Sequence, residues 1–413
     1  MLWRVSVDHS QRPPAGQLRS RSDCGMTAEL SQGLAPLSEL RRPLAELQAS
    51  VGAPVTARLP WLMTWAEYFP EYRPWTVTVR DGDDLRAVAC LAVRRVLGIN
   101  RVVCLGHRMS DRARLPVATE AAVEPLARGI AEALAGLGRP WSLSLEQLPA
   151  GDPVVHRLAE LLPHTRVSLG DPLPVLNIAP GLSPEKYAAK KFRQQTRAAR
   201  RRFQQRGLDP QLRYERRPDA IEPLLGQMRA IRRERDHDRG RRSELDDRDR
   251  ASWWRAITLE LAAQSELEAV TLHAGDRLVA YSLALLDGPT YRLWDGRFDP
   301  AYKDVWPGQL MYGELLQRLV MQGEWRQLDF MRGRTVFKDR LTNGAEECEN
   351  LQAWSSPLIR RLMLAPTASR AAARVWKGKH PVVNAGWPAT KRLILRVLSN
   401  PSTRAGRSGH EKL

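Results

Sequence analysis

The feature that most constrains the fold is an order of elements that occurs twice along the chain. In the first half, a helical stretch at 36–69 precedes two strands, a third strand RVVCLG, a helix at 120–138 and a strand at Trp141–Leu145. The first two strands alternate in polarity on either side of Asp81-Gly82-Asp83-Asp84, as in a β-hairpin. This order predicts a mixed sheet with helices packed on it.

The second half repeats this order of elements without a residue-level repeat. Its predicted elements are helices at about 219–236 and 248–264, strands at 267–274, 277–287 and 290–298, a helix at Pro307–Gln322 and a strand at Gln327–Met331. The boundary is predicted between 165 and 185, a stretch marked by Pro172, Pro174, Pro180 and Pro184. The sequence therefore predicts an α/β chain that contains two diverged copies of one mixed-sheet fold.

A basic helix is predicted at the start of the second half, over 184–206. Ser183-Pro184-Glu185 has a capping hydroxyl, a proline at the first turn and an acid that suits the helix dipole. Gly207 ends the helix. One buried stripe is expected at Phe192, Thr196, Ala199 and Phe203, with the arginines and lysines on the other faces.

Basic residues are concentrated in two stretches of a chain whose net charge is +18. Residues 186–217 hold twelve Lys and Arg against Asp209 and Glu215, and residues 355–413 hold twelve against Glu411. Because these stretches exceed the whole net charge, the rest of the chain is close to neutral. Such stretches favour an acidic partner: nucleic acid, anionic lipid or a phosphate-bearing cofactor. Weak, salt-sensitive binding to nucleic acid or anionic lipid is expected, although no nucleic-acid motif occurs.

The ends of the chain lack the patterns of the two halves. Residues 1–26 are rich in Arg, Ser and Pro without hydrophobic periodicity, which predicts a disordered extension, and Met26 is an alternative start. The two domains are assigned to 27–175 and 176–355, and a basic tail to 356–413. Within this tail, Thr390–Leu398 predicts an amphipathic helix that packs on the protein or contacts anionic lipid.

Cysteine usage and hydropathy bear on the compartment. The four cysteines, Cys24, Cys90, Cys104 and Cys348, match no metal-ligand spacing and fit a reducing cytosol. No apolar run approaches the roughly 18 residues of a spanning helix, and the N-terminus lacks a secretory apolar core. A cytoplasmic protein is expected, with association with the inner face of the membrane as a second expectation. Because His237 has no second ligand at metal spacing, no metal is predicted.

Residues 277–338 contain a series of short motifs in a fixed order. After a strand pair come Phe298-Asp299-Pro300-x-Tyr302 and Pro307-Gly308-x-Leu310, then Asp329-Phe330-x-Arg332-Gly333 and Phe337-Lys338. With the basic helix beginning Lys190-Lys191-Phe192-Arg193, this series resembles the acetyltransferase domain of CelD-like proteins associated with cellulose biosynthesis. That domain is a branch of the GNAT superfamily related to the FemAB peptidoglycan transferases. Two positions depart from the family pattern: Trp306 replaces a usual Ser, and Phe337 a usual Tyr.

The resemblance implies tandem GNAT-like domains, of which the first is degenerate. The first half resembles the family's degenerate N-terminal copy only loosely, through Pro60-Trp61-Leu62-x-x-Trp65 and the hairpin. The implied activity is N-acyl transfer from acyl-CoA, with acetyl-CoA as the simplest donor. The helix start Trp306-Pro307-Gly308-Gln309 is the predicted site for the donor's pyrophosphate, because helix N-termini offer free N–H groups and partial positive charge. An ordinary helix start under a tight loop is the alternative.

Three side chains are candidates for catalysis. Asp329 can act as the base that takes the acceptor's proton, or it is a structural acid bonded to backbone or to Arg332. Tyr312, or Tyr302 in its place, can protonate the leaving thiolate, since Phe337 cannot. Lys338 can bind phosphate or an acidic substrate.

The predicted function is therefore acyl transfer from acyl-CoA to an amine or hydroxyl of a small-molecule or glycan-precursor acceptor, in polysaccharide or cell-envelope metabolism. The chain lacks the Q/R-x-x-G-x-G/A loop with which most GNAT enzymes hold coenzyme A. Two alternatives therefore stay open: an aminoacyl-tRNA-dependent transferase like the FemAB relatives, and a non-catalytic basic scaffold that binds nucleic acid or membrane surfaces. Acceptor, acyl length and oligomeric state are not specified by the sequence.

Overall fold

The computed structural model describes residues 19–21, 25–138, 140–183, 186 and 188–364. The chain divides into two compact units, Met1–Ser356 and Pro357–Leu413, and both sheets lie in the first. The helix predicted at 390–398 and most of the extension predicted at 1–26 lie outside the described residues. Of that extension, Arg19–Arg21 form a strand beside Thr27–Glu29. Within the described ranges, no helix has the length and apolar character needed to cross a membrane.

The first sheet has eight strands in the order β1-β2-β3-β4-β5-β6-β15-β7. Their bounds are β1 Arg19–Arg21, β2 Thr27–Gln32, β3 Arg73–Asp81, β4 Asp84–Val96, β5 Ile99–Cys104, β6 Trp141–Pro149, β7 Arg166–Leu169 and β15 Cys348–Trp354. Only β5 and β6 run parallel to each other. Its helices are α1 Leu34–Glu39, α2 Arg41–Ser50, α3 Leu59–Tyr68, α4 Val123–Ala135 and α5 Pro153–Leu161, with short turns η1 Val55–Ala57 and η2 Glu120–Ala122.

The second sheet has seven strands in the order β14-β8-β13-β12-β11-β10-β9. Their bounds are β8 Leu173–Asn177, β9 Pro210–Glu215, β10 Leu267–Ala274, β11 Arg277–Asp287, β12 Thr290–Phe298, β13 Gln327–Asp329 and β14 Gly344–Glu346. Here β12 and β13 form the parallel pair. The helices are α6 Lys190–Gln205, α7 Pro218–Ile221, α8 Leu225–Asp238, α9 Arg248–Ala263, α10 Pro307–Gln322 and α11 Val336–Asp339, with turns η4 Glu222–Leu224, η5 Glu244–Asp246 and η6 Pro300–Val305.

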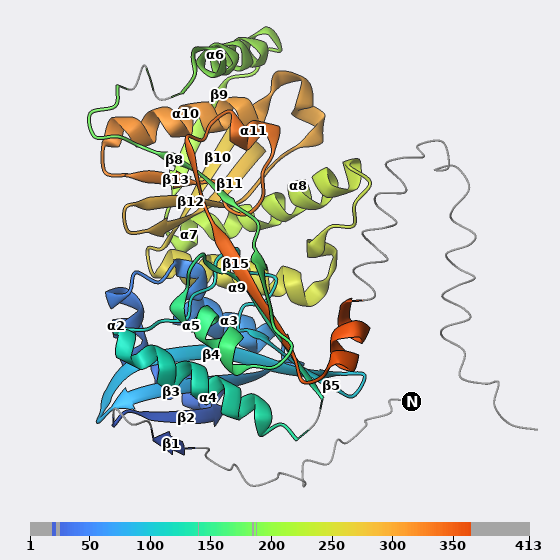
Figure 1. Ribbon diagram of the computed structural model, residues 1–413. Helices are drawn as coiled ribbons and strands as arrows, with labels where there is room; N and C mark the ends of the chain where they lie inside the picture. Colours follow the sequence, from blue (N-terminus) through green and yellow to red (C-terminus); the bar gives the residue numbers. More distant parts are fainter. Residues whose placement is uncertain (1–18, 22–24, 139, 184–185, 187, 365–413) are drawn as a thin grey trace, which may run out of the picture. The chain divides into compact units, whose positions relative to one another are not determined.

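The two sheets share one topology and exchange one strand each. In the first sheet β1 to β6 follow in chain order, and in the second sheet β9 to β13 do so. In each sheet the next strand comes from the other half, and the half's own last strand follows it. The strand β8 enters the second sheet directly after the first half, and β15 returns to the first sheet between β6 and β7. In Figure 1 the orange-red β15 accordingly lies in the sheet of the blue and cyan strands. The predicted α/β fold with two mixed sheets is confirmed.

The exchange corrects one assignment. The sequence places residues 348–354 with the second domain, whereas β15 pairs with β6 and β7 of the first sheet. Its alternating residues Leu351 and Ala353 are fully buried there. Strand periodicity predicts that such a segment pairs, but it carries no information on the distant partner.

Three hydrophobic cores hold this unit together. One lies between the first sheet and α4 and α5, and another between the second sheet and α6 and α10. The third contains side chains from both halves, including Trp61 and Trp65 of α3 and Trp253 and Trp254 of α9. Since α3 and α9 pack against each other, the halves share a core and behave as one compact unit.

Most helices follow the predicted periodicity, with two differences at their ends. The predicted stripe of α6 is confirmed, because Phe192, Thr196, Ala199 and Phe203 are its buried residues. However, α6 begins at Lys190 rather than at Pro184. The helical stretch predicted at 36–69 is divided into α1, α2, η1 and α3, since Gly52 adopts a positive φ and Pro54 is extended.

Candidate active site

A gap opens in the second sheet where its parallel strands part. Pairing between β12 and β13 covers only Thr290–Arg292 with Gln327–Asp329. Trp294 then forms a bulge in β12, because Leu293 and Asp295 pair with consecutive residues of β11. On the other side Met331 adopts a left-handed φ of 57° and turns the chain away. Bulges and left-handed residues of this kind occur often beside functional sites.

The N-terminus of α10 carries the predicted pyrophosphate residues. Trp306 caps it in a left-handed conformation, φ 59° and ψ 55°, and no acid occupies the first turn. The side-chain amide of Gln309 donates to the Phe192 carbonyl and to Thr196 Oγ1, and so bonds α10 to α6. The backbone N–H of Gln309 belongs to the first turn of α10. A Cβ at Gly308 would make an ordinary contact of 3.7 Å with Phe298, so packing alone does not require glycine there.

Several guanidinium groups surround this helix start. Arg202 stacks on the Trp306 ring at 3.9 Å and Arg235 on the Phe298 ring at 4.2 Å. Two guanidinium groups beside a helix N-terminus favour a polyanion such as a pyrophosphate.

Tyr312 lies at the gap. Its hydroxyl lies so close to the Cα of Gly296 on β12 that a Cβ there would collide with it. Its ring is 5.5 Å from Phe337, which in turn is 6.3 Å from Phe192. Burial raises the pKa of Tyr312, so the hydroxyl is protonated at neutral pH. Tyr302, the other tyrosine considered, instead stacks between Arg206 and Arg277 on η6.

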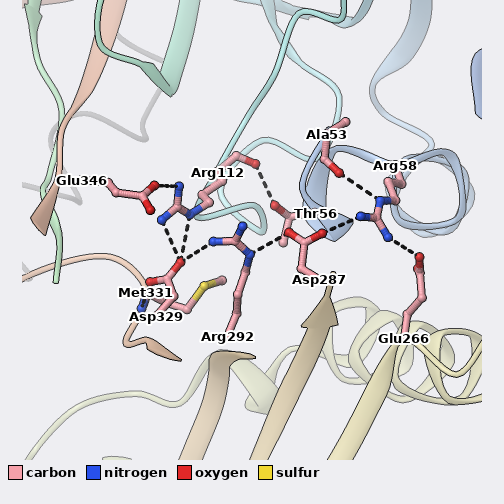
Figure 2. Close-up of polar contacts among 10 residues, drawn as sticks. All are labelled: Ala53, Thr56, Arg58, Arg112, Glu266, Asp287, Arg292, Asp329, Met331 and Glu346. Carbon is pink, nitrogen blue, oxygen red and sulfur yellow. Dashed lines mark hydrogen bonds and ion pairs between the residues drawn. The ribbon is translucent and has the colours of Figure 1, made fainter. Parts of the chain in front are cut away.

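Asp329 is fully buried and its carboxylate is fully engaged (Figure 2). Oδ2 accepts from Arg112 Nε at 2.9 Å and from Arg292 Nη1 at 2.6 Å, and Oδ1 accepts from the Met331 N–H at 2.7 Å. Two guanidinium groups and a backbone donor thus engage both oxygens of the carboxylate. These contacts favour the structural acid over the base, with arginines different from the expected Arg332.

The pairs around Asp329 belong to a network that crosses between the halves (Figure 2). Arg292 also bonds Asp287 at 2.7 Å, and Asp287 bonds Arg58 of the first half at 2.5 Å. Arg58 ends the network at Glu266, and on the other side Arg112 bonds Glu346 at 2.5 Å. Acids and arginines alternate throughout, so each buried charge has an opposite neighbour.

Lys338 stabilises the turn after β13 by hydrogen bonds to its backbone. Its Nζ donates to the carbonyls of Met331 at 3.1 Å and Arg332 at 2.9 Å. Burial lowers the pKa of Lys338, while Asp111 and Asp329 oppose the change. The structure therefore brings Asp329, Lys338 and the left-handed Met331 together on one side of the gap.

A cavity of about 160 Å³ beside the bulge was not predicted from the sequence. It is lined by Trp294 and Asp295 of β12, by Trp253 of α9, and by Arg108 and Asp111 from the loop after β5 of the first half. Asp295 is almost fully buried and accepts from Arg232 Nη1, Trp254 Nε1 and the Tyr281 hydroxyl. No local pattern marks these residues, because the cavity forms only when the two halves meet.

The corresponding gap in the first sheet is closed. Pairing of β5 with β6 ends at Val103 and Ser144, and the loop that follows β5 is bonded across the opening by the Ala113 N–H to the Gln147 carbonyl. The next helix begins beside acids, Glu120 in η2 and Glu124 in α4. Those charges at a helix N-terminus repel an incoming anion. In the described part of the chain no group of three or more His, Cys, Asp or Glu is arranged to hold a metal ion.

Comparison with known proteins agrees with this arrangement of strands and helices. Residues 190–339 match the family model of the acetyltransferase (GNAT) domain. This stretch of the chain is therefore similar to the GNAT acetyltransferase domain. The match covers α6 through α11, which includes the open gap and the start of α10. No curated protein sequence matches the chain.

Solved structures share the fold of both halves of the chain. FemX superposes with a TM-score of 0.54 and 10% identity, covering 74% of this chain and 95% of FemX. The C-terminal domain of a predicted lysylphosphatidylglycerol synthetase from Agrobacterium fabrum superposes with a TM-score of 0.52 and 10% identity. This match covers 80% of the chain and 96% of that domain. A conserved protein of unknown function from Bacteroides thetaiotaomicron superposes with a TM-score of 0.50 and 12% identity. This match covers 77% of the chain and 97% of that protein. At these identities the likeness concerns the fold, and it extends over both sheets.

Proposed function

We propose that the chain is an N-acyltransferase that moves an acyl group from acyl-CoA to an amine. The donor's pyrophosphate binds at the start of α10, at Trp306, Pro307, Gly308 and Gln309, and its thioester enters the gap between β12 and β13. The acceptor is a small molecule or a glycan precursor that approaches from the cavity beside Trp294. A role in polysaccharide or cell-envelope metabolism, of the CelD-like kind, belongs to the same proposal.

The observation that carries the proposal is the difference between two equivalent helices. α4 follows β5 and α10 follows β12, the first strand of each parallel pair, but α4 has Glu124 in its first turn, whereas α10 has no acid there. Arg202 and Arg235 flank the start of α10 through Trp306 and Phe298. A di-anionic pyrophosphate is therefore attracted to one of the two helices and repelled by the other.

The gap supplies the remaining requirements of acyl transfer. The bulge at Trp294 breaks the β11–β12 ladder, so backbone N–H groups of β12 can turn toward a thioester carbonyl and stabilise its developing oxyanion. Tyr312 reaches the edge of β12 with a protonated hydroxyl, a suitable position to protonate the departing thiolate. Lys338 keeps the opposite wall in place through two backbone carbonyls. Asp329 is proposed to position that wall rather than to take a proton.

Ligand-dependent thermal unfolding tests the proposal most cheaply. The full chain is heated with acetyl-CoA, butyryl-CoA and palmitoyl-CoA, and with desulfo-CoA as a non-acyl reference. Binding to the folded state at a ligand concentration of 100 Kd adds about 2.7 kcal/mol, a readily measured rise in Tm. Release of thiol in the presence of a panel of primary amines then tests transfer. If no acyl-CoA raises Tm, the aminoacyl-tRNA reading or the basic scaffold replaces this proposal.

A further inference from the structure

The loop after β5 brings two charged residues of the first half to the cavity beside Trp294. Arg108 and Asp111 line it together with Trp294, Asp295 and Arg297 of the second half. The other charged groups of the cavity are matched: Arg232 with Asp295 and Glu244, Arg250 with Glu244, and Arg297 with Asp295. Within the described residues, neither Arg108 nor Asp111 forms an ion pair.

Asp111 is held in place by its neighbours in the loop. Ser110 Oγ donates to the Thr56 carbonyl at 3.0 Å, and Thr56 Oγ1 donates to the Arg112 carbonyl at 2.8 Å (Figure 2 shows the latter). The Arg112 side chain is anchored on Asp329 and Glu346. These contacts fix the backbone on both sides of Asp111, and its carboxylate accepts a hydrogen bond from the backbone N–H of Arg332.

The position of Asp111 suits a proton acceptor. It lies beside Arg332 and Lys338, on the wall that follows β13, while Trp294 and Asp295 at the bulge of β12 line the same cavity. An amine that attacks a thioester in the gap therefore approaches past this carboxylate. Asp329 and Asp295, the other acids near the gap, are each held by two or more donors on their Oδ2 atoms, among them Arg112 and Arg292 on Asp329 and Arg232 on Asp295.

We infer that Asp111, a residue of the degenerate first half, is the catalytic base of the transferase and binds the acceptor as an ammonium ion. This inference rests on the proposed acyl transfer. The acceptor is accordingly a cationic primary amine. Arg108, exposed and left-handed at a φ of 66°, is placed to contact an anionic group on the same molecule.

The proposed acyl transfer conserves protons and electrons. The Asp111 carboxylate takes one proton from the ammonium, and the free amine attacks the thioester carbonyl. The C–N bond forms, the C–S bond breaks, and the second amine proton passes to the departing thiolate, which leaves as a thiol. Asp111 then releases its proton to solvent, so one acyl-CoA and one ammonium give one amide, one thiol and one proton.

The electrostatic surroundings agree with this role. Burial raises the pKa of Asp111, while Arg332 and Lys338 oppose the rise, and a base with a higher pKa accepts a proton more readily. The charged groups that face it are Arg108 on its own loop, Arg232 on α8, Glu244 on η5, Arg250 on α9, Asp295 and Arg297 on β12, Asp329 on β13, Arg332 after β13 and Lys338 on α11. The acid limb of kcat/KM is therefore expected above the ordinary carboxyl range near pH 4.

The test compares Asp111→Asn with Asp83→Asn, the same change at an exposed acid in the hairpin turn. Acetyl-CoA affinity is measured by calorimetry, and amine-dependent thiol release is measured with a panel of primary amines from pH 3 to 9. Asp111→Asn is expected to lower turnover about 100-fold or more without changing acetyl-CoA affinity, and to remove the acid limb. Asp111→Glu should restore part of the rate, and Asp83→Asn should resemble the parent.

The outcomes separate this inference from the proposed function. If Asp111→Asn keeps turnover within threefold of the parent, or if the parent binds acetyl-CoA but no amine promotes thiol release, Asp111 is not the base of an amine transferase. If the parent binds no acyl-CoA, the proposed function fails and the inference fails with it. Should Asp111→Asn not fold, the pH profile of the parent decides, since an acid limb at or below pH 4 contradicts the inference.

Discussion

The two sheets of this chain have the same strand order but differ at the point where their parallel strands part. In the second sheet the strands open beside a helix with no acid in its first turn, and Arg202 and Arg235 flank its start. In the first sheet the loop after β5 is bonded across the opening, and Glu124 lies in the first turn of α4. This difference is the basis on which the donor site is proposed in the second sheet.

The first half retains structural importance despite its closed gap. The loop that closes it carries Arg112, which pairs with Asp329, and Asp111, which lines the cavity of the second half. The first half also supplies β8, the strand next to β13. The first half thus contributes side chains and a strand to the proposed site of the second half, with which it shares one core.

The largest effect is expected from breaking the network at Asp329, which should lower the stability of the unit that both halves form. Asp329→Asn leaves Arg112 and Arg292 with one acid each, in surroundings where their side chains are only 13% and 11% exposed. Unpairing buried charges is costly, so we expect the free energy of unfolding to fall by about 4 kcal/mol. Urea denaturation measures this, with Asp171→Asn as control, because the exposed Asp171–Arg332 pair should contribute less than about 1 kcal/mol. Equal losses for the two variants would contradict the account.

The exchanged strand gives the next largest effect. Leu351→Ala removes a fully buried side chain of β15 and is expected to cost about 3 kcal/mol, whereas Leu169→Ala on β7, 78% exposed, should cost little. Hydrogen exchange should show weaker protection in β6 and β7, although Leu351 lies after the whole second half. If protection falls first in β13 and β14, the strand does not connect the halves as described.

A smaller effect concerns the donor site itself. Gly308→Asp places a negative charge at the start of α10 and should weaken acetyl-CoA binding by about 1 kcal/mol, roughly fivefold. Gly308→Ala is the matched control, because its Cβ meets only Phe298 at an ordinary 3.7 Å and the change adds no charge. Calorimetry on folded proteins compares them. Acetyl-CoA binding unchanged by Gly308→Asp would move the donor site away from α10.

The smallest effect is a pH dependence within the second half. Hydrogen bonds from His237 and Arg233 lower the pKa of Asp246 to about 2, below the ordinary value of 3.8. A depressed pKa stabilises the fold above the unfolded value, and this stabilisation is lost as the pH falls from about 4 toward 2. The difference in unfolding free energy between parent and Asp246→Asn should therefore shrink over that range. A difference that stays constant would show that Asp246 does not titrate as described.

The sequence predicts the fold well where local periodicity determines structure. The strands β10, β11 and β12 have the predicted bounds, because glycines at 275 and 288 mark the turns between three short, mostly buried runs. The buried stripe of α6 and the bounds of α10 also follow from helical spacing and from Pro307 and Gly323.

The remaining features depend on contacts between residues that are far apart in sequence. The pairing of β15 with β6, and that of Arg112 with Asp329, each join positions about 200 residues apart. Local patterns carry no information on such partners, so the sequence assigns residues 348–354 to the wrong sheet and cannot predict the buried environment of Asp329. For the same reason the sequence gives no signal for Asp111, which lies in a loop without a recognisable motif.

Hydrogen exchange with and without saturating acetyl-CoA tests the central claim most directly, because it reports on both gaps in one measurement. The account predicts that acetyl-CoA slows exchange at 293–298, at 306–311 and at 330–333, which are the bulge of β12, the start of α10 and the turn after β13. Exchange at 105–126, the equivalent region of the first half, should change little. Protection centred on 105–126 would contradict the assignment of the donor site, and acetyl-CoA that changes exchange nowhere would contradict the proposed transferase.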